Sequence, residues 1–342
     1  MDGYLVTDVN NVYYFTEFLD IPGAALCLVV PVEGEATLFV STLSETAANI
    51  EAKGCIVKQV KTGEKLVDKA VEEIKRLKFK YFGFDKVAVS TYLKFLEELK
   101  DTKFEEKTGV CYDLRRVKDA EEVALIRKAA RLTDIGVNAA VEAVKPGIRE
   151  YEVAAEAEYA MRLKGSSGVA FETIVASGVR SAYPHGLCTD KIIREGEFVT
   201  IDLGAMYRGY RCDITRTIVV GKPSRKQQEL FNLVLNAQKL GIKSIHAGIK
   251  GRDVDGIVRE MMIKAGYGDY FIHGLGHGVG LEIHEPPSLS QASEDTLVEG
   301  NVVTVEPGVY LPKFGGVRIE DTVLVLKDRA ERFTKAPKKM TP

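Results

Sequence analysis

An internal repeat constrains the fold of this chain more than any other feature. The segment EGEFVTIDLGAMY, residues 195–207, aligns with EGNVVTVEPGVY, residues 299–310, and Asp202 then falls on Glu306. In both copies apolar and polar residues alternate with the period of two that is typical of a half-buried β-strand. A strand that occurs twice with an acid at the same position predicts two structurally equivalent halves.

A second strand follows each copy and also begins with an acid. Residues 213–220, DITRTIVV, align with residues 320–326, EDTVLVL, so that Asp213 falls on Glu320. Segments with helical periodicity precede both copies; they cover residues 119–164, 224–245 and 251–266. We therefore expect a pseudo-two-fold, α-then-β arrangement that brings both hairpins into one sheet, with the four carboxylates converging.

Four converging carboxylates cannot all stay ionised without a neutralising partner. Two unit charges ~4 Å apart repel each other by roughly 4 kcal/mol at an effective dielectric constant of about 20. Either protons or cations must compensate. Four negative charges match two divalent cations, and bridging carboxylates are typical of two-metal sites. The sequence therefore predicts a dinuclear metal centre that contains Asp202, Asp213, Glu306 and Glu320.

The remaining ligand is expected from the segment HGLGHGVGLEIHE, residues 273–285, which holds three of the five histidines of the chain. Its alternating glycines allow the backbone to approach an ion closely. His277, which has glycine on both sides, is the candidate ligand. One imidazole among four carboxylates is a ligand set dominated by oxygen, which favours Mn²⁺ or Co²⁺ and differs from a thiolate-rich zinc site. Zn²⁺ and Fe²⁺ also accept these ligands.

Each of these features taken alone also has an ordinary structural interpretation. Asp202 and Asp213 are compatible with exposed residues beside hairpin turns, and Glu320 with a solvated strand edge. The glycine-rich segment is compatible with a mobile loop, and a single histidine is more often structural than a ligand. The acids at corresponding positions of both copies favour the metal centre over these interpretations.

Composition excludes several classes of partner. The chain has 342 residues, of which 45% are hydrophobic and 28% charged, with a net charge of −2, which is ordinary for a soluble globular protein. It shows no basic patch for nucleic acid and no apolar run near the ~20 residues needed to span a bilayer. Five scattered cysteines without a C-x-x-C pair argue against a disulfide framework or a thiolate zinc site. We expect a cytoplasmic protein.

Two domains are expected, residues 1–115 and residues 116–342. The first has the pattern of a small α/β unit. Its strands are expected at residues 26–32, 36–40 and 81–85, and its helices at residues 64–78 and 90–100. Near Asp119 the sequence pattern changes, and a long, alanine-rich segment with helical periodicity begins.

On these residues the second part of the chain, residues 119–330, resembles the pita-bread (M24) metallopeptidase family. The dinuclear site of that family has ligands in the order Asp, Asp, His, Glu, Glu, and this chain supplies Asp202, Asp213, His277, Glu306 and Glu320. The first part is similar to the N-terminal domain of prolidases and Xaa-Pro aminopeptidases. The resemblance implies a two-domain α+β and α/β protein. A pita-bread fold, a pseudo-two-fold α/β repeat around a curved antiparallel sheet, follows a smaller creatinase/prolidase-like domain.

The resemblance also implies an activity. It implies a metal-dependent, proline-specific exopeptidase that uses two divalent ions per chain, forms a homodimer and hydrolyses the Xaa-Pro bond of small peptides. Xaa-Pro dipeptidase (prolidase) is favoured, and Xaa-Pro aminopeptidase acting on longer peptides is the alternative. A metal-free creatinase-type hydrolase and a non-catalytic binding module are less favoured, because the complete set of metal ligands and His185 are present.

Two departures from the family pattern are visible. Relatives usually begin with a helix before the strand that residues 2–15 resemble, and this chain starts almost at that strand. Some dipeptide-restricted relatives carry an arginine shortly after the second substrate histidine, where this chain has Pro286, Pro287 and Ser288. The second departure weakens the case for strict dipeptide cleavage.

The resemblance assigns roles to the residues around the metal ions. The two ions make a bridging water available as nucleophile, and Glu306 takes its proton and passes it to the leaving proline nitrogen. His185 and His284, one upstream in each copy of the repeat, are expected to hydrogen-bond the scissile carbonyl and the substrate. One metal ion would bind the free amine of the substrate.

Further candidates lie close to these residues. His273, four residues before the histidine ligand, is expected in the same pocket. Arg318, two residues before Glu320 and hence on the same strand face, is expected to orient an inner carboxylate or to meet the C-terminus of the substrate. Tyr310 is a candidate for a hydrogen bond at the substrate site. The Thr215 hydroxyl is expected to lie behind the metal ligands and to hydrogen-bond one of them.

Overall fold

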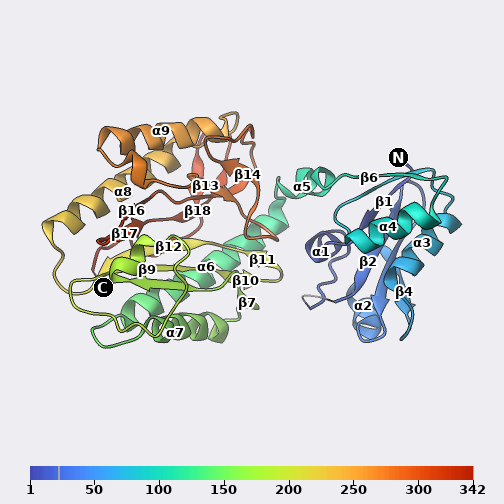
Figure 1. Cartoon of the computed structure of the whole chain (residues 1–342), viewed down its shortest axis with the longest axis horizontal. Coiled ribbons are helices and arrows are strands. Elements are labelled where there is room, and N and C mark those ends of the chain that lie inside the picture. The colour runs from blue at the N-terminus through green and yellow to red at the C-terminus, as the bar shows by residue number, and fades with distance from the viewer. Residues whose placement is uncertain (22–23, 342) are drawn as a thin grey trace. The chain divides into compact units, whose positions relative to one another are not determined.

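The computed structural model describes residues 1–21 and 24–341. The chain divides into two compact units, Met1–Arg115 and Arg116–Pro342 (Figure 1). Each unit is described below by itself.

The first unit contains a six-stranded mixed sheet in the order β4-β3-β2-β1-β5-β6. The β1–β5, β5–β6 and β3–β4 pairs are parallel, whereas the β1–β2 and β2–β3 pairs are antiparallel. The strands are β1 (Gly3–Val6), β2 (Leu26–Pro31), β3 (Ala36–Ser41), β4 (Cys55–Val60), β5 (Tyr81–Phe84) and β6 (Lys103–Glu106). The three strands expected from sequence are present.

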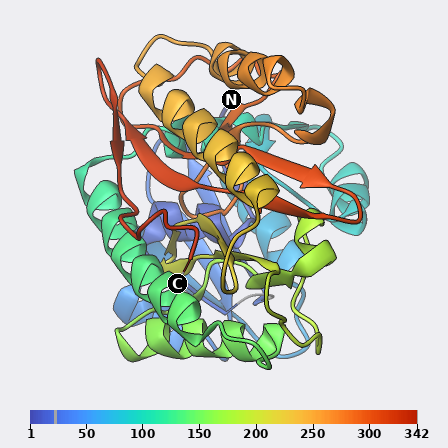
Figure 2. The ribbon, with the colours of Figure 1, turned by 90° about the vertical axis from the view of Figure 1, so that its left-hand side faces the viewer.

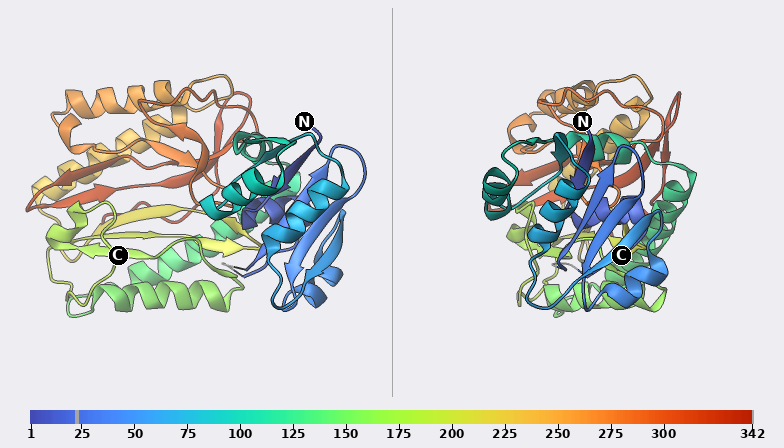
Figure 3. Two further views of the ribbon diagram at one scale, coloured as in Figure 1. Left: turned by 45° about the vertical axis from the view of Figure 1, so that its right-hand side comes forward. Right: turned by 90° about the vertical axis from the view of Figure 1, so that its right-hand side faces the viewer.

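Helices cover both faces of this sheet (Figure 3). One apolar cluster joins the sheet to α3 (Leu66–Arg76) and α4 (Val89–Glu98), the two helices expected from sequence. A second cluster joins it to three short helices; these are α1 (Val9–Thr16), α2 (Glu45–Glu51) and α5 (Gly109–Arg115). Because neighbouring strand residues alternate between the two clusters, both faces are buried.

The stretch at residues 2–15 is only partly a strand. It forms β1 and then turns into α1, since the side chain of Asp8 accepts hydrogen bonds from the backbone amides of Asn10 and Asn11. An N-cap of this kind satisfies amides that have no partner inside the helix. The local cap therefore ends the strand earlier than the family resemblance implies.

The second unit contains two pairs of long helices in the segments expected from sequence. Asp119 and Ser224 begin the first helix of each pair with a capping box. The helices are α6 (Ala120–Ala143), α7 (Glu150–Leu163), α8 (Arg225–Ser244) and α9 (Gly251–Lys264), with the short 3₁₀ turns η1 (Gly178–Ala182) and η2 (Gly268–Tyr270). No helix in the described part of the chain combines the length and apolar character needed to cross a bilayer.

The strands of the second unit lie between the α6–α7 pair and the α8–α9 pair (Figures 1 and 2). The main sheets have the orders β12-β9-β8 and β14-β13-β15-β18-β19, and two small ones the orders β11-β10-β7 and β16-β17. In the first half the strands are β7 (Gly168–Val169), β8 (Ile174–Ser177), β9 (Phe198–Leu203), β10 (Ala205–Tyr207), β11 (Tyr210–Arg211) and β12 (Ile214–Val219). In the second half they are β13 (Gly276–Gly278), β14 (Glu285–Leu289), β15 (Val302–Val305), β16 (Gly308–Leu311), β17 (Gly315–Arg318), β18 (Asp321–Val325) and β19 (Ala330–Arg332).

The repeat seen in the sequence is present as equivalent hydrogen bonds. In the first half the amide of Gly196 donates to the carbonyl of Val220 at 2.7 Å, and in the second half Gly300 donates to Val325 at 3.1 Å. Both glycines have positive φ, +78° and +91°, a conformation that other residues rarely adopt. The two halves thus begin their central hairpins with the same turn.

The two hairpins do not form the single continuous sheet that was expected. They belong to separate sheets that border each other along Asp213 and Glu320. One backbone bond crosses this border, from the amide of Glu320 to the carbonyl of Thr215 at 3.1 Å. The Thr322 hydroxyl donates to the Asp213 carbonyl at 2.8 Å, and the Thr217 hydroxyl makes a similar bond with β17. Threonine side chains thus replace part of a backbone ladder.

Candidate metal centre

The five predicted ligands come from five different strand ends or strands. Asp202 lies in β9 and His277 in β13, whereas Asp213 and Glu320 immediately precede β12 and β18, and Glu306 follows β15. All five line one cavity of about 720 Å³ in the second unit. Side chains that are spread over more than a hundred residues of sequence are thus brought together.

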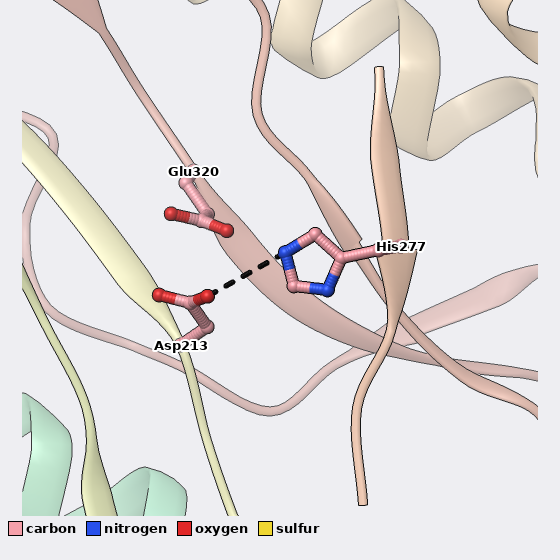
Figure 4. Close-up of side chains that lie close together, drawn as sticks. All are labelled: Asp213, His277 and Glu320. Atoms are coloured by element: carbon pink, nitrogen blue, oxygen red, sulfur yellow. Dashed lines mark ion pairs between the residues drawn. The ribbon is translucent and has the colours of Figure 1, made fainter. Parts of the chain in front are cut away.

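The distances within the cluster suit shared ligation of a cation. Ligand atoms of Asp213, His277 and Glu320 all lie within 4.8 Å of one another (Figure 4). His277 Nε2 is 3.6 Å from Asp213 Oδ2 and 3.3 Å from Glu306 Oε1. His277 Nδ1 lies 3.1 Å from the carbonyl of Gly278, which can only accept, so Nδ1 carries a proton and Nε2 is the ring nitrogen that faces the carboxylates.

Three carboxylate oxygens in the cluster are buried without a hydrogen-bond partner in the described structure: Asp202 Oδ1, Asp213 Oδ1 and Glu320 Oε1. Buried polar atoms in folded proteins are nearly always bonded, and an unsatisfied one costs roughly 1–3 kcal/mol. A divalent cation would satisfy all three. The donor set of carboxylate oxygens and one imidazole nitrogen therefore fits hard or borderline divalent ions.

The electrostatics of the cluster also favour a bound cation. Burial, followed by the charges of the neighbouring carboxylates, raises the pKa of Asp213 and Glu320 well above their usual values. Burial also acts to raise the pKa of Glu306, but the hydrogen bond with His277 and the charges of His277, His273 and Arg318 together outweigh it and lower that pKa to about 2. In the absence of metal the cluster would retain protons that a divalent cation replaces.

Arg318 lies beside the ligands and makes three hydrogen bonds. Its Nη2 donates to Asp202 Oδ2 at 2.5 Å, Nε to the Thr215 hydroxyl at 3.0 Å and Nη1 to the Tyr310 hydroxyl at 2.8 Å. The Thr215 hydroxyl in turn donates to Glu320 Oε2 at 2.7 Å. Of the two contacts expected for Arg318, the one with an inner carboxylate is therefore present in the structure.

The other predicted histidines line the same cavity. The rings of His284 and His277 meet edge to face with their centroids 4.2 Å apart, and His185 lies in the loop after η1. His273 Nε2 is 2.9 Å from the Tyr310 hydroxyl. Tyr310 itself is buried behind His273 and Arg318 and is not among the residues of the cavity wall.

Some residues at the site were not predicted from the sequence. The Thr304 hydroxyl accepts from the His277 amide at 3.0 Å and lies 3.3 Å from Glu306 Oε1. Its alignment with Thr200 in the repeat was an available signal. The apolar wall had none, since its residues follow no common period; it consists of Phe171, Ile174, Tyr183, Pro184, Ile272 and Ile283.

Comparisons with known proteins find matches in both units of the chain. The model of metallopeptidase family M24 matches residues 124–327, and that of the creatinase/prolidase N-terminal domain matches residues 1–117. A relative named Xaa-Pro dipeptidase, from Pyrococcus furiosus, is 44% identical over 342 residues, which are 99% of this chain and 95% of the relative.

Solved structures show the same likeness over the full length. The Xaa-Pro dipeptidase from Bacillus anthracis superimposes with a TM-score of 0.94 at 38% identity, covering 99% of this chain and 94% of that one. The X-Pro aminopeptidase from Thermotoga maritima has a TM-score of 0.90 at 34% identity, covering 100% of this chain and 97% of that one. Both names refer to peptidases that recognise proline.

Proposed function

This chain belongs to metallopeptidase family M24 and is a peptidase, and on that premise we propose that it hydrolyses the Xaa-Pro bond of small peptides, with Xaa-Pro dipeptides favoured. The observation that carries this proposal is the convergence of five metal-ligand side chains in one cavity with three unpartnered carboxylate oxygens. The P. furiosus relative and the B. anthracis structure carry the name Xaa-Pro dipeptidase.

Membership in a metallopeptidase family implies that the chain uses divalent metal. We propose that two ions are held by Asp202, Asp213, His277, Glu306 and Glu320. The predominance of oxygen donors favours Mn²⁺ or Co²⁺, and Zn²⁺ or Fe²⁺ would also be accepted. When bound, such ions lower the pKa of a coordinated water and polarise the peptide carbonyl.

The side chains of the cavity would move protons and hold the substrate. Glu306, whose side chain is still 17% exposed, would accept a proton from the attacking water and deliver it to the proline nitrogen. His185 and His284 would donate hydrogen bonds to the scissile carbonyl as negative charge develops on its oxygen. The apolar wall formed by Phe171, Ile174 and its neighbours offers a surface for the proline ring.

A specific observation also favours cleavage of longer peptides. Arg318 is the one Lys or Arg among the described residues of the cavity wall. Its guanidinium is already bonded to Asp202, Thr215 and Tyr310. A dipeptide carboxylate would therefore find no uncommitted arginine or lysine there. Xaa-Pro aminopeptidase activity is thus the second candidate function.

The test compares hydrolysis of an Xaa-Pro dipeptide with that of Xaa-Pro-Yaa-Zaa, before and after chelation. We expect cleavage of the dipeptide that is lost on chelation and restored by Mn²⁺ or Co²⁺. Rapid cleavage of the longer peptide with none of the dipeptide would favour the second candidate. Undiminished hydrolysis by metal-free protein would contradict both candidates.

We further propose that the enzyme is a homodimer, as the family resemblance implies, and that it acts in the cytoplasm, the compartment expected from the sequence. Sedimentation of the metal-loaded protein and fractionation of cells that produce it test these two expectations. Neither is needed for the chemistry described above, because all residues assigned to it belong to one chain.

A further inference from the structure

One buried carboxylate joins the two ends of the loop that carries His185. Glu150, the first residue of α7, is 0% exposed. Its Oε1 accepts from the amide and the hydroxyl of Ser177 at 2.8 and 2.9 Å. Its Oε2 accepts from the amide and the hydroxyl of Thr189 at 3.1 and 2.6 Å. The Glu150 side chain therefore bonds both flanks of the loop formed by residues 178–188, and Lys191 Nζ adds a bond to the Ser177 hydroxyl at 2.7 Å.

The loop is braced internally by a second residue bound to the same carboxylate. Arg180 Nε lies 3.2 Å from Glu150 Oε2, while Arg180 Nη2 donates to the carbonyl of Leu187 at 2.5 Å. Charge-assisted hydrogen bonds of this kind are stronger than neutral ones. The Glu150 carboxylate thus bonds both flanks of the loop and the arginine within it.

This loop contributes Tyr183, Pro184 and His185 to the cavity wall. Its tip is a tight turn in which the amide of Gly186 donates to the carbonyl of Tyr183 at 3.0 Å. Because His185 sits at this tip, its position follows from the position of the two flanks. A displacement of about 1 Å at a reacting group can cost on the order of 10²-fold in rate.

The second half of the repeat has no carboxylate at the position equivalent to Glu150. The Glu150 amide donates to the carbonyl of Lys191, and the equivalent bond of the second half runs from Gly251 to Asp295. Gly251 therefore occupies the position of Glu150 and has no side chain. Since the repeat folds with glycine at this position, the fold alone does not require a carboxylate there.

We propose that Glu150 is a positioning residue that holds the cavity-lining loop, and with it His185, in the geometry used for catalysis. The proposal rests on the proposed function, because that function assigns His185 to the substrate. Glu150 itself does not line the cavity, and it acts only through the loop that it fastens.

The test is Glu150→Gln, with Glu152→Gln as matched control. A glutamine has a single acceptor oxygen, and its amide group would face donors of Ser177 or Thr189, so one flank is released. Glu152 lies in the same helical turn, and its carboxylate bonds the Arg149 amide instead of the loop. We expect Glu150→Gln to lower kcat by up to about 10²-fold with a smaller change in KM. Amide exchange across residues 177–189 should become faster, metal content should stay unchanged, and the control should show none of these effects.

A double variant tests whether the effect passes through His185. In a His185→Ala background, Glu150→Gln should lower kcat little further, because the group that it positions is already absent. Of the bonds to Glu150, Thr189→Val removes only the one from the hydroxyl, and it should give a smaller loss of kcat. This variant tests the proposal if Glu150→Gln does not fold. An unchanged kcat in Glu150→Gln, or an equal loss in the His185→Ala background, would overturn the proposal. Failure of the proposed function would instead appear in the wild-type enzyme, as absence of Xaa-Pro hydrolysis.

Discussion

Arg318 holds three different groups of the centre in fixed relation through one planar guanidinium. It bonds the proposed ligand Asp202, the Thr215 hydroxyl that supports Glu320, and the Tyr310 hydroxyl. A lysine keeps the charge but presents one compact ammonium in place of the fork. We predict that Arg318→Lys lowers the affinity for Mn²⁺ by roughly 10- to 100-fold, as is typical when a partner of a metal ligand is altered.

Titration calorimetry of the metal-free protein with Mn²⁺ measures this change directly. Arg127→Lys serves as the control, since that guanidinium pairs with Glu331 at a partly exposed position away from the cavity. Equal affinities for wild type and Arg318→Lys would mean that Asp202 keeps its orientation without the guanidinium.

Lys338 is a second side chain whose environment has a measurable consequence. Burial, together with the charges of Arg216 and Arg332, lowers the pKa of Lys338 from 10.5 to about 8, although the ion pair with Asp321 opposes this shift. Between these pKa values the folded protein binds fewer protons at this site than the unfolded chain. The free energy of unfolding therefore rises with pH through this window.

We predict that Lys338→Met removes this contribution. Urea unfolding of wild type and variant at about pH 7 and about pH 10 compares the two slopes. The stability of the wild type relative to the variant should increase toward the higher pH. A difference between the two proteins that stays constant with pH would show that Lys338 keeps an ordinary pKa.

At the scale of single elements, glycines decide how closely β13 approaches its neighbours. A Cβ added to Gly276 would lie 2.1 Å from the carbonyl oxygen of Thr304 in β15. Gly256, inside α9, has open space in the same position. We predict that Gly276→Ala displaces the strand that carries His277 and lowers both metal affinity and stability. Gly256→Ala should stabilise the protein by about 0.5–1 kcal/mol.

Chemical denaturation together with metal titration checks both variants. The pair separates a steric effect at the centre from the general effect of replacing glycine. If Gly276→Ala binds metal as the wild type does, the backbone must be able to relax at β15, and the close approach of β13 is not a requirement of the site.

The elements that the sequence predicts are those with local signals. Apolar and polar residues alternate along β9 and β12, and the same pattern recurs in β15 and β18. The acids on or next to these strands could therefore be located before the fold was known. The glycines beside His277 are equally local. The bond from Glu320 to Thr215 and the carboxylate of Glu150 between Ser177 and Thr189 depend on pairing across the fold, for which a single sequence carries no periodic signal.

At the scale of the whole molecule, the buried clusters respect the division into two units. Among the described residues, two clusters lie within Met1–Arg115 and two within Arg116–Pro342. Every residue of the metal cavity belongs to the second unit. Metal binding therefore acts on a part of the chain that has cores of its own.

This arrangement predicts where metal stabilises the protein. A ligand at about 100 times its Kd stabilises the state that binds it by about 2.7 kcal/mol. We predict that adding Mn²⁺ to chelated protein slows amide exchange in β9, β13, β15 and β18, while the slowest amides of β1 and β5 keep their rates. Hydrogen exchange followed by mass spectrometry measures both sets in one sample. Asp213→Asn, which removes a proposed ligand, should abolish the response. An equal slowing in both units would mean that they unfold together, so that metal bound in one unit stabilises the entire chain.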